Sequence, residues 1–154
     1  FIDLTSLEKL NLAYNYLNSI RNRTFFHLKK LSTLNLDYNK ISQIEPDAFN
    51  GLIELKSLFL NNNLIKNLNM IIFSNLRKIE TLDLSGNYIE SIGENTFVGM
   101  NKLSTLFLTY NLLRNFEQNT FKKLDSLKTL MLEDNIFFIL DQGLESMPRI
   151  ENLI

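Results

Sequence analysis

One pattern of apolar residues recurs every 24 positions and constrains the fold more than any other feature of the chain. Each copy reads LxxLxLxxNxL, where x is a variable residue, and six copies begin at positions 7, 31, 55, 79, 103 and 127. The LxL part places apolar residues at alternate positions, which is typical of a short β-strand. A fixed period of this length predicts a stacked solenoid, in which each repeat contacts only its neighbours.

An asparagine closes the strand segment at the same position of every repeat. We call these residues the ladder asparagines: Asn15, Asn39, Asn63, Asn87, Asn111 and Asn135. An amide side chain both donates and accepts hydrogen bonds, so it can satisfy backbone groups that a turn leaves unpaired, whereas aspartate only accepts. Because a buried unsatisfied group costs about 1–3 kcal/mol, we interpret these six residues as structural.

The second half of each repeat carries apolar columns of its own and returns the chain on the outer side. A phenylalanine recurs at positions 25, 49, 73, 97 and 121. We interpret these residues as a packing column and call them the spine phenylalanines. Pro46, Gly51 and Gly99 near this column favour irregular or short helical segments over long helices. We predict an α/β solenoid of horseshoe shape, with one short parallel strand per repeat on the concave face and irregular or short helical convex segments.

We expect residues 1–154 to form a single array rather than several domains. Full repeats start at the six positions given above, a partial repeat covers residues 1–6, and a further partial repeat over residues 150–154 begins a seventh strand. One repeat alone buries too little apolar surface to offset the entropy of ordering it, so arrays need capped ends. We therefore expect a fragment of a longer array, with both end caps missing.

The charge balance argues against anionic partners. Sixteen basic and seventeen acidic residues leave a formal net charge of −1, so no cationic excess favours nucleic acid or an anionic membrane surface. The longest apolar run, Ile136 to Leu140, is far shorter than the roughly 20 residues that cross a bilayer. We expect no nucleic acid partner and no membrane contact by this segment.

The residues needed for catalysis or metal binding are scarce. Cysteine is absent and His27 is the single histidine, so neither a thiolate site nor an acid–base pair is predicted. The adjacent carboxylates Glu133 and Asp134 fall short of the six to eight oxygen ligands that calcium takes. We expect no catalytic residue, no metal site and no cofactor.

The full unit, LxxLxLxxNxLxxIxxxxFxxLxx, resembles the 24-residue leucine-rich repeats of animal extracellular proteins. These include Toll and Toll-like receptor ectodomains, Slit-type guidance proteins and hormone-receptor ectodomains, and residues 44–52 and 92–100 are especially similar to the receptor versions. The resemblance implies an extracellular or cell-surface location and ligand binding on a horseshoe. The chain departs from the family where a proline often follows the convex leucine, which argues mildly against the small matrix proteoglycans. The residues found there are Arg21, Glu45, Asn69, Gly93 and Glu117.

Recognition must reside in the variable residues between the packing columns. The central exposed column of the strands reads Asn11, Asn35, Phe59, Asp83, Phe107 and Met131. Its three large apolar residues form a candidate aromatic patch with Tyr14, Tyr38 and Tyr110, which lie two columns away. A mildly acidic strip that includes Asp37 lies beside this patch. The predicted ligand-binding residues are Phe59, Asp83, Phe107, Met131, Tyr38, Tyr110, Glu133 and Asp134. The alternatives are that the aromatic rings stack on each other to shield strand edges and that the acids form a solvated face.

The sixth repeat departs from the regular pattern. It is one residue short, lacks the spine phenylalanine and has Leu144 and Met147 where the columns slip, and Ile136, Phe138 and Ile139 are apolar at positions outside the core columns. These residues either contact a partner or a second copy, or pack on the next repeat. The sequon Asn22-Arg23-Thr24 is a candidate glycosylation site, although about 2.7 sequons would arise by chance in a chain of this composition, so that finding one is no evidence of secretion.

These observations lead to a functional hypothesis. We expect a non-catalytic protein-recognition module from a secreted or cell-surface receptor ectodomain of innate immune, guidance or adhesion type. It would bind a protein ligand or co-receptor, and homodimer formation is also considered. The alternatives are a structural or adhesive matrix component that self-associates and a targeting region of a larger enzyme.

Overall fold

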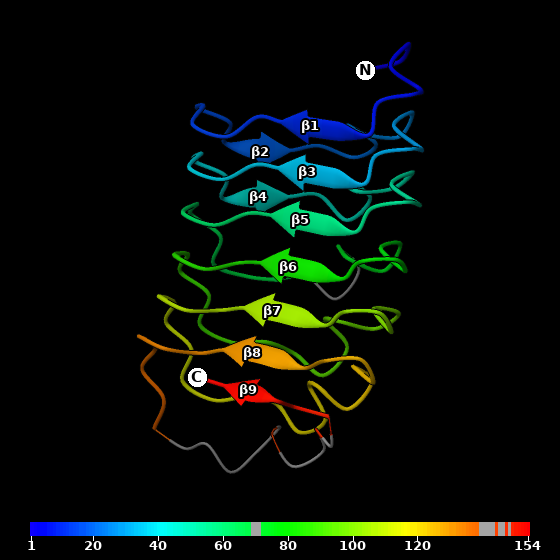
Figure 1. Ribbon diagram of the computed structural model, residues 1–154. Coiled ribbons are helices and arrows are strands. Elements are labelled where there is room, and N and C mark those ends of the chain that lie inside the picture. Colours follow the sequence, from blue (N-terminus) through cyan, green and yellow to red (C-terminus); the bar gives the residue numbers. More distant parts are fainter. Residues whose placement is uncertain (69–71, 139–143, 145–146, 148) are drawn as a thin grey trace.

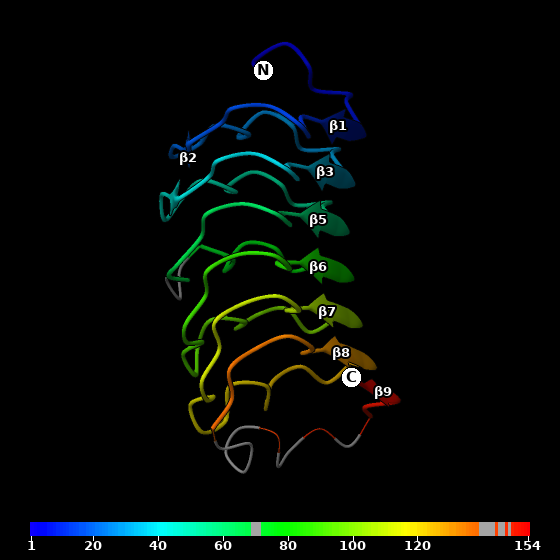
Figure 2. The ribbon, with the colours of Figure 1, turned by 90° about the vertical axis from the view of Figure 1, so that its left-hand side faces the viewer.

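The structure is a stack of coils with one strand per coil on a single face. The computed structural model describes residues 1–68, 72–138, 144, 147 and 149–154. Figure 1 shows the strands one above another, and each strand is followed by a turn at the left of the view. After a rotation by 90°, the strands line one side of the stack and the return segments line the other (Figure 2). The solenoid prediction is confirmed.

The strands pair in parallel into a seven-stranded sheet in the order β1-β3-β5-β6-β7-β8-β9. Leu10 pairs with Leu34 and Leu34 with Leu58, so the register follows the 24-residue period. Thr129 of β8 pairs with Asn152 of β9, so the spacing between these two strands is 23 residues. The sixth repeat is one residue shorter than the others. The strands are β1 (Lys9–Asn11), β3 (Thr33–Asn35), β5 (Ser57–Phe59), β6 (Thr81–Asp83), β7 (Thr105–Phe107), β8 (Thr129–Met131) and β9 (Asn152–Leu153).

The outer side of the stack is irregular. Its regular part is a two-stranded parallel sheet formed by β2 (Ser19–Ile20) and β4 (Gln43–Ile44). The segments around the spine phenylalanines are successive turns closed by bonds over three residues, such as Leu28 N–H to the Phe25 C=O at 2.9 Å. No α-helix occurs among the residues that the structure describes, so of the two convex alternatives the irregular one holds. Among these residues there is also no helix that could span a bilayer.

The core consists of the inward apolar columns. Leu34, Leu58, Leu82 and Leu106 of the strands have no exposed surface, which is the expected result of the LxL alternation. Phenylalanine rings stack along the opposite wall, with centroids 6.3 Å apart between Phe25 and Phe49 and 6.2 Å between Phe49 and Phe73. Phe1 extends this column by stacking on Phe25 at 5.8 Å. The core is therefore shared between coils rather than closed within one.

The ladder asparagines bond to two coils at once. In Asn87, Nδ2 donates to the carbonyls of Leu84 and Ser85 in its own coil and of Leu60 in the preceding coil, at 3.0–3.1 Å. Its Oδ1 accepts the Ile65 N–H at 3.0 Å. The same four bonds recur at positions 39, 63, 111 and 135. Each of these amides uses both its donor and its acceptor.

Two residues that replace the family's proline join neighbouring coils. Glu45 Oε2 accepts the Asn22 N–H at 2.7 Å, and Glu117 Oε2 accepts the Glu94 N–H at 3.0 Å. The Asn22 side chain in turn accepts the Asp47 N–H at 2.9 Å through Oδ1. Proline has no carboxylate, so it could not make these bonds. Asn69, at the same position of the third repeat, lies outside the described residues.

The irregular residues of the sixth coil are partly buried and partly exposed. Leu144 and Met147 are partly buried against the core, and Phe137 contacts Phe116 with ring centroids 5.1 Å apart. Ile136 and Phe138 instead remain exposed, at 41% and 81%. Ile139 lies outside the described residues. The slipped columns thus supply core packing, while two apolar side chains face solvent.

Candidate functional site

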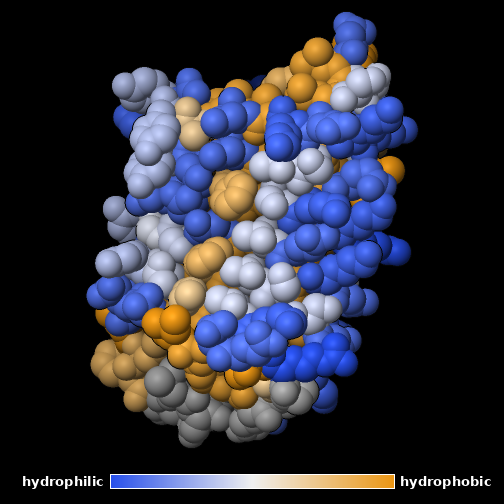
Figure 3. All heavy atoms as spheres, in the orientation of Figure 1, coloured by the Kyte–Doolittle hydropathy of each residue, from blue (hydrophilic) through white to orange (hydrophobic). Residues whose placement is uncertain are grey.

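The central strand column runs through the middle of the strand face. Phe59 pairs with Asp83, Asp83 with Phe107 and Phe107 with Met131 in neighbouring strands, so these four predicted residues lie side by side. All four are half-buried. Figure 3 shows this face as separate hydrophobic areas within a hydrophilic surface, and a larger hydrophobic area lies near the C-terminal coils. Asp83 separates Phe59 from Phe107, so the column is not a continuous aromatic stack.

Asp83 is held by bonds within the strand face. Its Oδ1 accepts the Ser85 N–H at 2.9 Å, and its Oδ2 accepts a hydrogen bond from Asn61 Nδ2 at 3.3 Å. Asp37, two coils away, accepts the Asn61 N–H at 2.9 Å through Oδ1. Both carboxylates therefore cap backbone turns, which is a structural role that the sequence analysis did not anticipate for them.

Asp37 is the more deeply placed carboxylate of the two, with 9% of its surface exposed. Burial raises the pKa of the Asp37 carboxyl above its usual value, the N–H of Asn61 lowers it, and the negative charge of Asp83 raises it again, with a net upward shift. A raised pKa means that the folded state holds the proton more tightly than the unfolded state. Asp37 therefore contributes stability at low pH that is lost as the pH rises through its raised pKa.

Asp37→Asn is expected to stabilise the chain at pH 7 and to have little effect at pH 3. Asparagine keeps an oxygen that can accept the Asn61 N–H but carries no charge to repel Asp83. The measurement is the free energy of unfolding by urea at several pH values, with exposed Asp125→Asn as the control. A stability difference between Asp37→Asn and the wild type that does not change with pH would contradict this account.

Three tyrosines lie at the same position of the turns that follow β1, β3 and β7. We call these residues, Tyr14, Tyr38 and Tyr110, the tyrosine edge. Their side chains are 75%, 46% and 65% exposed, and the rings of Tyr14 and Tyr38 stack 4.5 Å apart at 6°. All three have positive φ angles, between 51° and 57°. The equivalent residues of the other coils are Asn62, Gly86 and Asp134, again with positive φ. Positive φ is uncommon for a bulky side chain and natural for Asn or Gly.

At the other end of the edge, three predicted site residues meet. The Asp134 carboxylate accepts a hydrogen bond from the Tyr110 hydroxyl, which raises the pKa of that phenol, and the charges of Asp134 and Glu133 add to the shift. Tyr110 thus keeps its proton over the physiological range and remains a donor. The structure brings Tyr110, Glu133 and Asp134 together, whereas Tyr38 belongs to the opposite end with Tyr14.

A second exposed column lies two residues beyond the tyrosine edge and was missed by the sequence analysis. Tyr16 is 83% exposed, Leu64 39% and Tyr88 47%, and Lys40 Nζ lies 4.9 Å from the centre of the Tyr16 ring. The signal was available, since these residues recur at 24-residue spacing immediately after the ladder asparagines. The tyrosine edge, this second column and the exposed Phe138 together form a surface that we call the lateral flank. Its residues are Tyr14, Tyr16, Tyr38, Leu64, Tyr88, Tyr110, Ile136 and Phe138.

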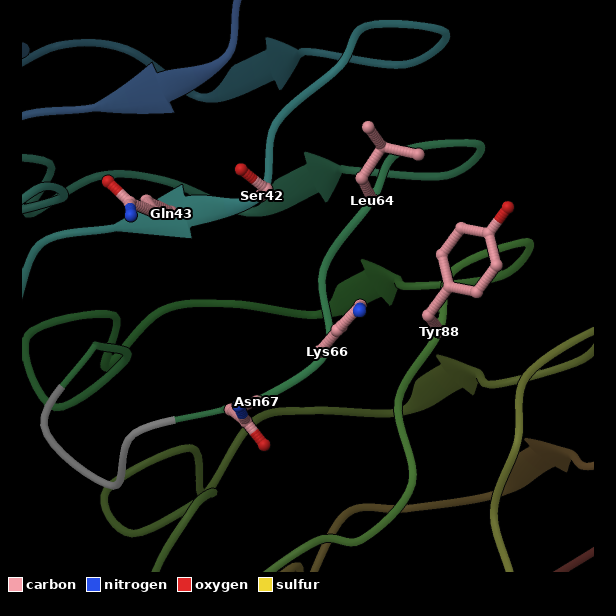
Figure 4. Close-up of a pocket in the computed structure, with 6 residues that line it drawn as sticks. All are labelled: Ser42, Gln43, Leu64, Lys66, Asn67 and Tyr88. Carbon is pink, nitrogen blue, oxygen red and sulfur yellow. The ribbon is translucent and has the colours of Figure 1, made fainter.

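The lateral flank contains a shallow depression of about 560 Å³ between the second, third and fourth coils. Figure 4 shows its six lining residues, with Lys66 drawn between Tyr88 and Asn67. The lining residues are Ser42, Gln43, Leu64, Lys66, Asn67 and Tyr88. None of them was among the predicted site residues.

The chemistry of the remaining polar groups is limited. His27 packs edge-on against the Phe26 ring, with centroids 5.3 Å apart. No cluster of three or more His, Cys, Asp or Glu side chains able to hold a metal occurs within the part of the chain that the structure describes.

The repeat geometry agrees with comparisons to known proteins. The family model for leucine-rich repeats matches residues 1–41, 29–89, 53–113 and 77–137, which together cover most of the chain. The chain belongs to the leucine-rich repeat family. No curated protein gives a match to this leucine-rich repeat chain.

One solved structure makes the resemblance more specific. The chain in the crystal structure of the TLR13–ssRNA13 complex is similar to this leucine-rich repeat chain with a TM-score of 0.67 and 33% sequence identity. The match covers 94% of this chain and 24% of that chain, so this chain spans about a quarter of its length. The predicted resemblance to Toll-like receptor ectodomains is confirmed.

Proposed function

We propose that the chain is a non-catalytic recognition module of a receptor ectodomain, located outside the cell or in a topologically equivalent compartment, that binds a protein ligand or co-receptor. The proposed contact surface joins the tyrosine edge to the central strand column. The similarity to TLR13 supports a receptor role, and the repeat architecture supports interaction as the activity.

The observation that carries this proposal is the backbone conformation of the tyrosine edge. The left-handed region costs a residue other than glycine about 1–2 kcal/mol. Asn62 and Gly86 show that the same turn forms with residues better suited to positive φ. Tyr14, Tyr38 and Tyr110 therefore carry a conformational cost that their exposed rings do not recover by burial in the core. Exposed tyrosines are enriched at protein interfaces, where they become buried.

Replacing the three edge tyrosines by asparagine is expected to abolish partner binding without lowering stability. Asparagine adopts positive φ more easily than tyrosine, so the melting temperature should stay the same or rise. The immobilised chain should retain a defined protein from extracellular fluid or solubilised membranes, and after purification that protein should bind the triple variant at least tenfold more weakly. Equal affinity for the wild type and the variant would refute the proposed edge contact.

The strand face is tested in the same assay by Phe59→Ser combined with Phe107→Ser. Both rings are half-buried and separated by Asp83, so each is available to a partner without being central to the core. Circular dichroism should confirm that the double variant remains folded. Binding retained by this variant but lost by the tyrosine variant would restrict the site to the edge.

A second candidate ligand is single-stranded RNA. The TLR13 structure is a complex with an RNA, and the stacked pair Tyr14–Tyr38 offers the kind of aromatic surface on which bases stack. The formal charge of −1 and the carboxylates of Glu133 and Asp134 beside Tyr110 oppose a phosphate backbone. Binding of a fluorescent oligouridine that weakens steeply with salt would favour this candidate over a protein ligand.

Glycosylation of Asn22 remains a prediction that follows from the extracellular proposal. The Asn22 Oδ1 accepts the Asp47 N–H, and the side chain is exposed. This bond occupies the oxygen and not Nδ2, the atom to which a glycan would attach. A shift in mass on glycosidase treatment of the chain secreted from animal cells would establish the modification.

A further inference from the structure

A turn on the outer side of the second coil requires glycine, and an asparagine precedes that glycine. Gly51 lies in the left-handed region at φ 96°. A Cβ atom at this residue would meet the carbonyl oxygen of Phe26 in the preceding coil and lie 2.7 Å from Phe26 Cα, so a side chain fits only if the backbone shifts. Gly99 takes the same place two coils further on, at φ 91°, but it follows Val98. The fold therefore requires glycine directly after Asn50, and every other asparagine of the chain precedes a residue with a side chain.

The side-chain amide of Asn50 and the backbone N–H of Gly51 are not held by hydrogen bonds to other described residues. Asn50 is half-buried and takes part in the turn through its backbone, since its N–H donates to the Asp47 C=O at 3.1 Å. The Leu52 N–H donates to the Phe49 C=O at 3.3 Å. Both distances exceed the usual value of about 2.9–3.0 Å. Moving the Asn50 side chain toward the Gly51 nitrogen therefore disturbs only these two long bonds.

We propose that Asn50–Gly51 is a site of spontaneous deamidation, at which the asparagine is converted to aspartate and isoaspartate. The Gly51 backbone nitrogen forms a bond to Asn50 Cγ, the bond from Cγ to Nδ2 breaks, and the proton of the Gly51 N–H leaves with Nδ2 as ammonia. Glycine favours this ring closure because it has no side chain to hinder the approach of its nitrogen. The product is a five-membered cyclic imide. This inference is independent of the proposed recognition function.

Water opens the imide at either of its two carbonyl carbons. Attack at Cγ restores the original backbone and leaves aspartate at position 50. Attack at the backbone carbonyl carbon leaves the Gly51 nitrogen attached to Cγ, so the main chain runs through the former side chain as isoaspartate. The net change in both cases is one water gained and one ammonia lost, without oxidation or reduction.

The two products should differ in their effect on stability. The aspartyl form keeps the backbone geometry, and the Asn50 side chain has no hydrogen bond to a described residue that it could lose. The isoaspartyl form adds one carbon atom to the main chain next to Gly51, where even a single Cβ atom would meet the Phe26 backbone. We expect isoaspartate to lower the melting temperature and aspartate to leave it nearly unchanged.

The test is incubation of the folded 154-residue chain in mildly alkaline buffer at body temperature, followed by peptide mass spectrometry. The peptide that contains Asn50 should convert from amide to acid at least tenfold faster than peptides with any other asparagine. It should appear as two products of equal mass, one of which is methylated by a protein isoaspartyl methyltransferase. Asn50→Gln is the matched control, because glutamine would have to close a less favourable six-membered ring, and it should remove the methylated product. Conversion at Asn50 no faster than elsewhere, or equal methylation of the Asn50→Gln variant, would overturn the inference.

The effect on stability is measured on the deamidated fraction after its separation by ion exchange. Its melting temperature should lie below that of Asn50→Asp prepared directly. Repeated cycles of the methyltransferase with S-adenosylmethionine, which return isoaspartate to aspartate, should raise it toward that of Asn50→Asp. Identical melting of the deamidated fraction and Asn50→Asp would contradict the predicted clash with Phe26.

Discussion

Asn87→Ala is expected to lower the free energy of unfolding by about 3 kcal/mol or more, because alanine leaves several buried backbone groups without partners. Asn87 is 5% exposed, and its side chain makes four hydrogen bonds that span two coils. The Ile65 N–H would lose its acceptor and the Leu60 carbonyl its donor, and water cannot readily reach either of them.

The measurement is thermal unfolding, in which a loss of this size corresponds to a fall in melting temperature of roughly 6–12 °C for a chain of this length. Asn15→Ala is the matched control, since the exposed Asn15 side chain bonds to the carbonyls of Leu12 and Ala13 in its own coil. That control should lose less than about 1 kcal/mol. Similar losses for the two variants would show that the bonds between coils do not carry the effect.

Asn87→Asp separates hydrogen bonding from the size of the side chain. Aspartate has nearly the same shape but no donor, so three carbonyl oxygens would face a carboxylate instead of an amide. We expect it to destabilise the chain at least as much as alanine does at neutral pH. This result would explain why each of the six repeats carries asparagine and none carries aspartate at this position.

The fold could be predicted from the sequence because packing repeats strictly. The alternation at Leu34, Leu58 and Leu82 places these side chains in the core, and the 24-residue register follows from stacking identical columns. The same argument predicted a seventh strand in the region of β9. The pattern could not distinguish short helices from irregular turns on the convex side. Either kind of segment places one phenylalanine per coil in the core.

The proposed contact surface was less predictable than the fold, because the exposed apolar side chains do not follow a single column of the repeat. Asp83 stays a predicted ligand contact, and its carboxylate also accepts the Ser85 N–H within its own turn, which the residue pattern did not indicate. Tyr16 and Tyr88 were missed although they directly follow Asn15 and Asn87, because the prediction placed recognition on the strand face. The positive φ of Tyr38 is a backbone property that residue type alone would not suggest.

Phe49→Ala is expected to cost about 3–5 kcal/mol, because it opens a cavity in the centre of the shared core. Phe49 has no exposed surface and its ring lies between those of Phe25 and Phe73, with centroids 6.3 and 6.2 Å away. Its loss therefore removes contacts with two neighbouring coils, and urea unfolding should show a lower midpoint. Ile53→Ala, at a side chain that is 54% exposed on the same return segment, should change stability by less than about 1 kcal/mol. If both variants unfolded at the same urea concentration, the phenylalanine column would contribute little, and the array would have to be held together mainly by its strands and asparagines.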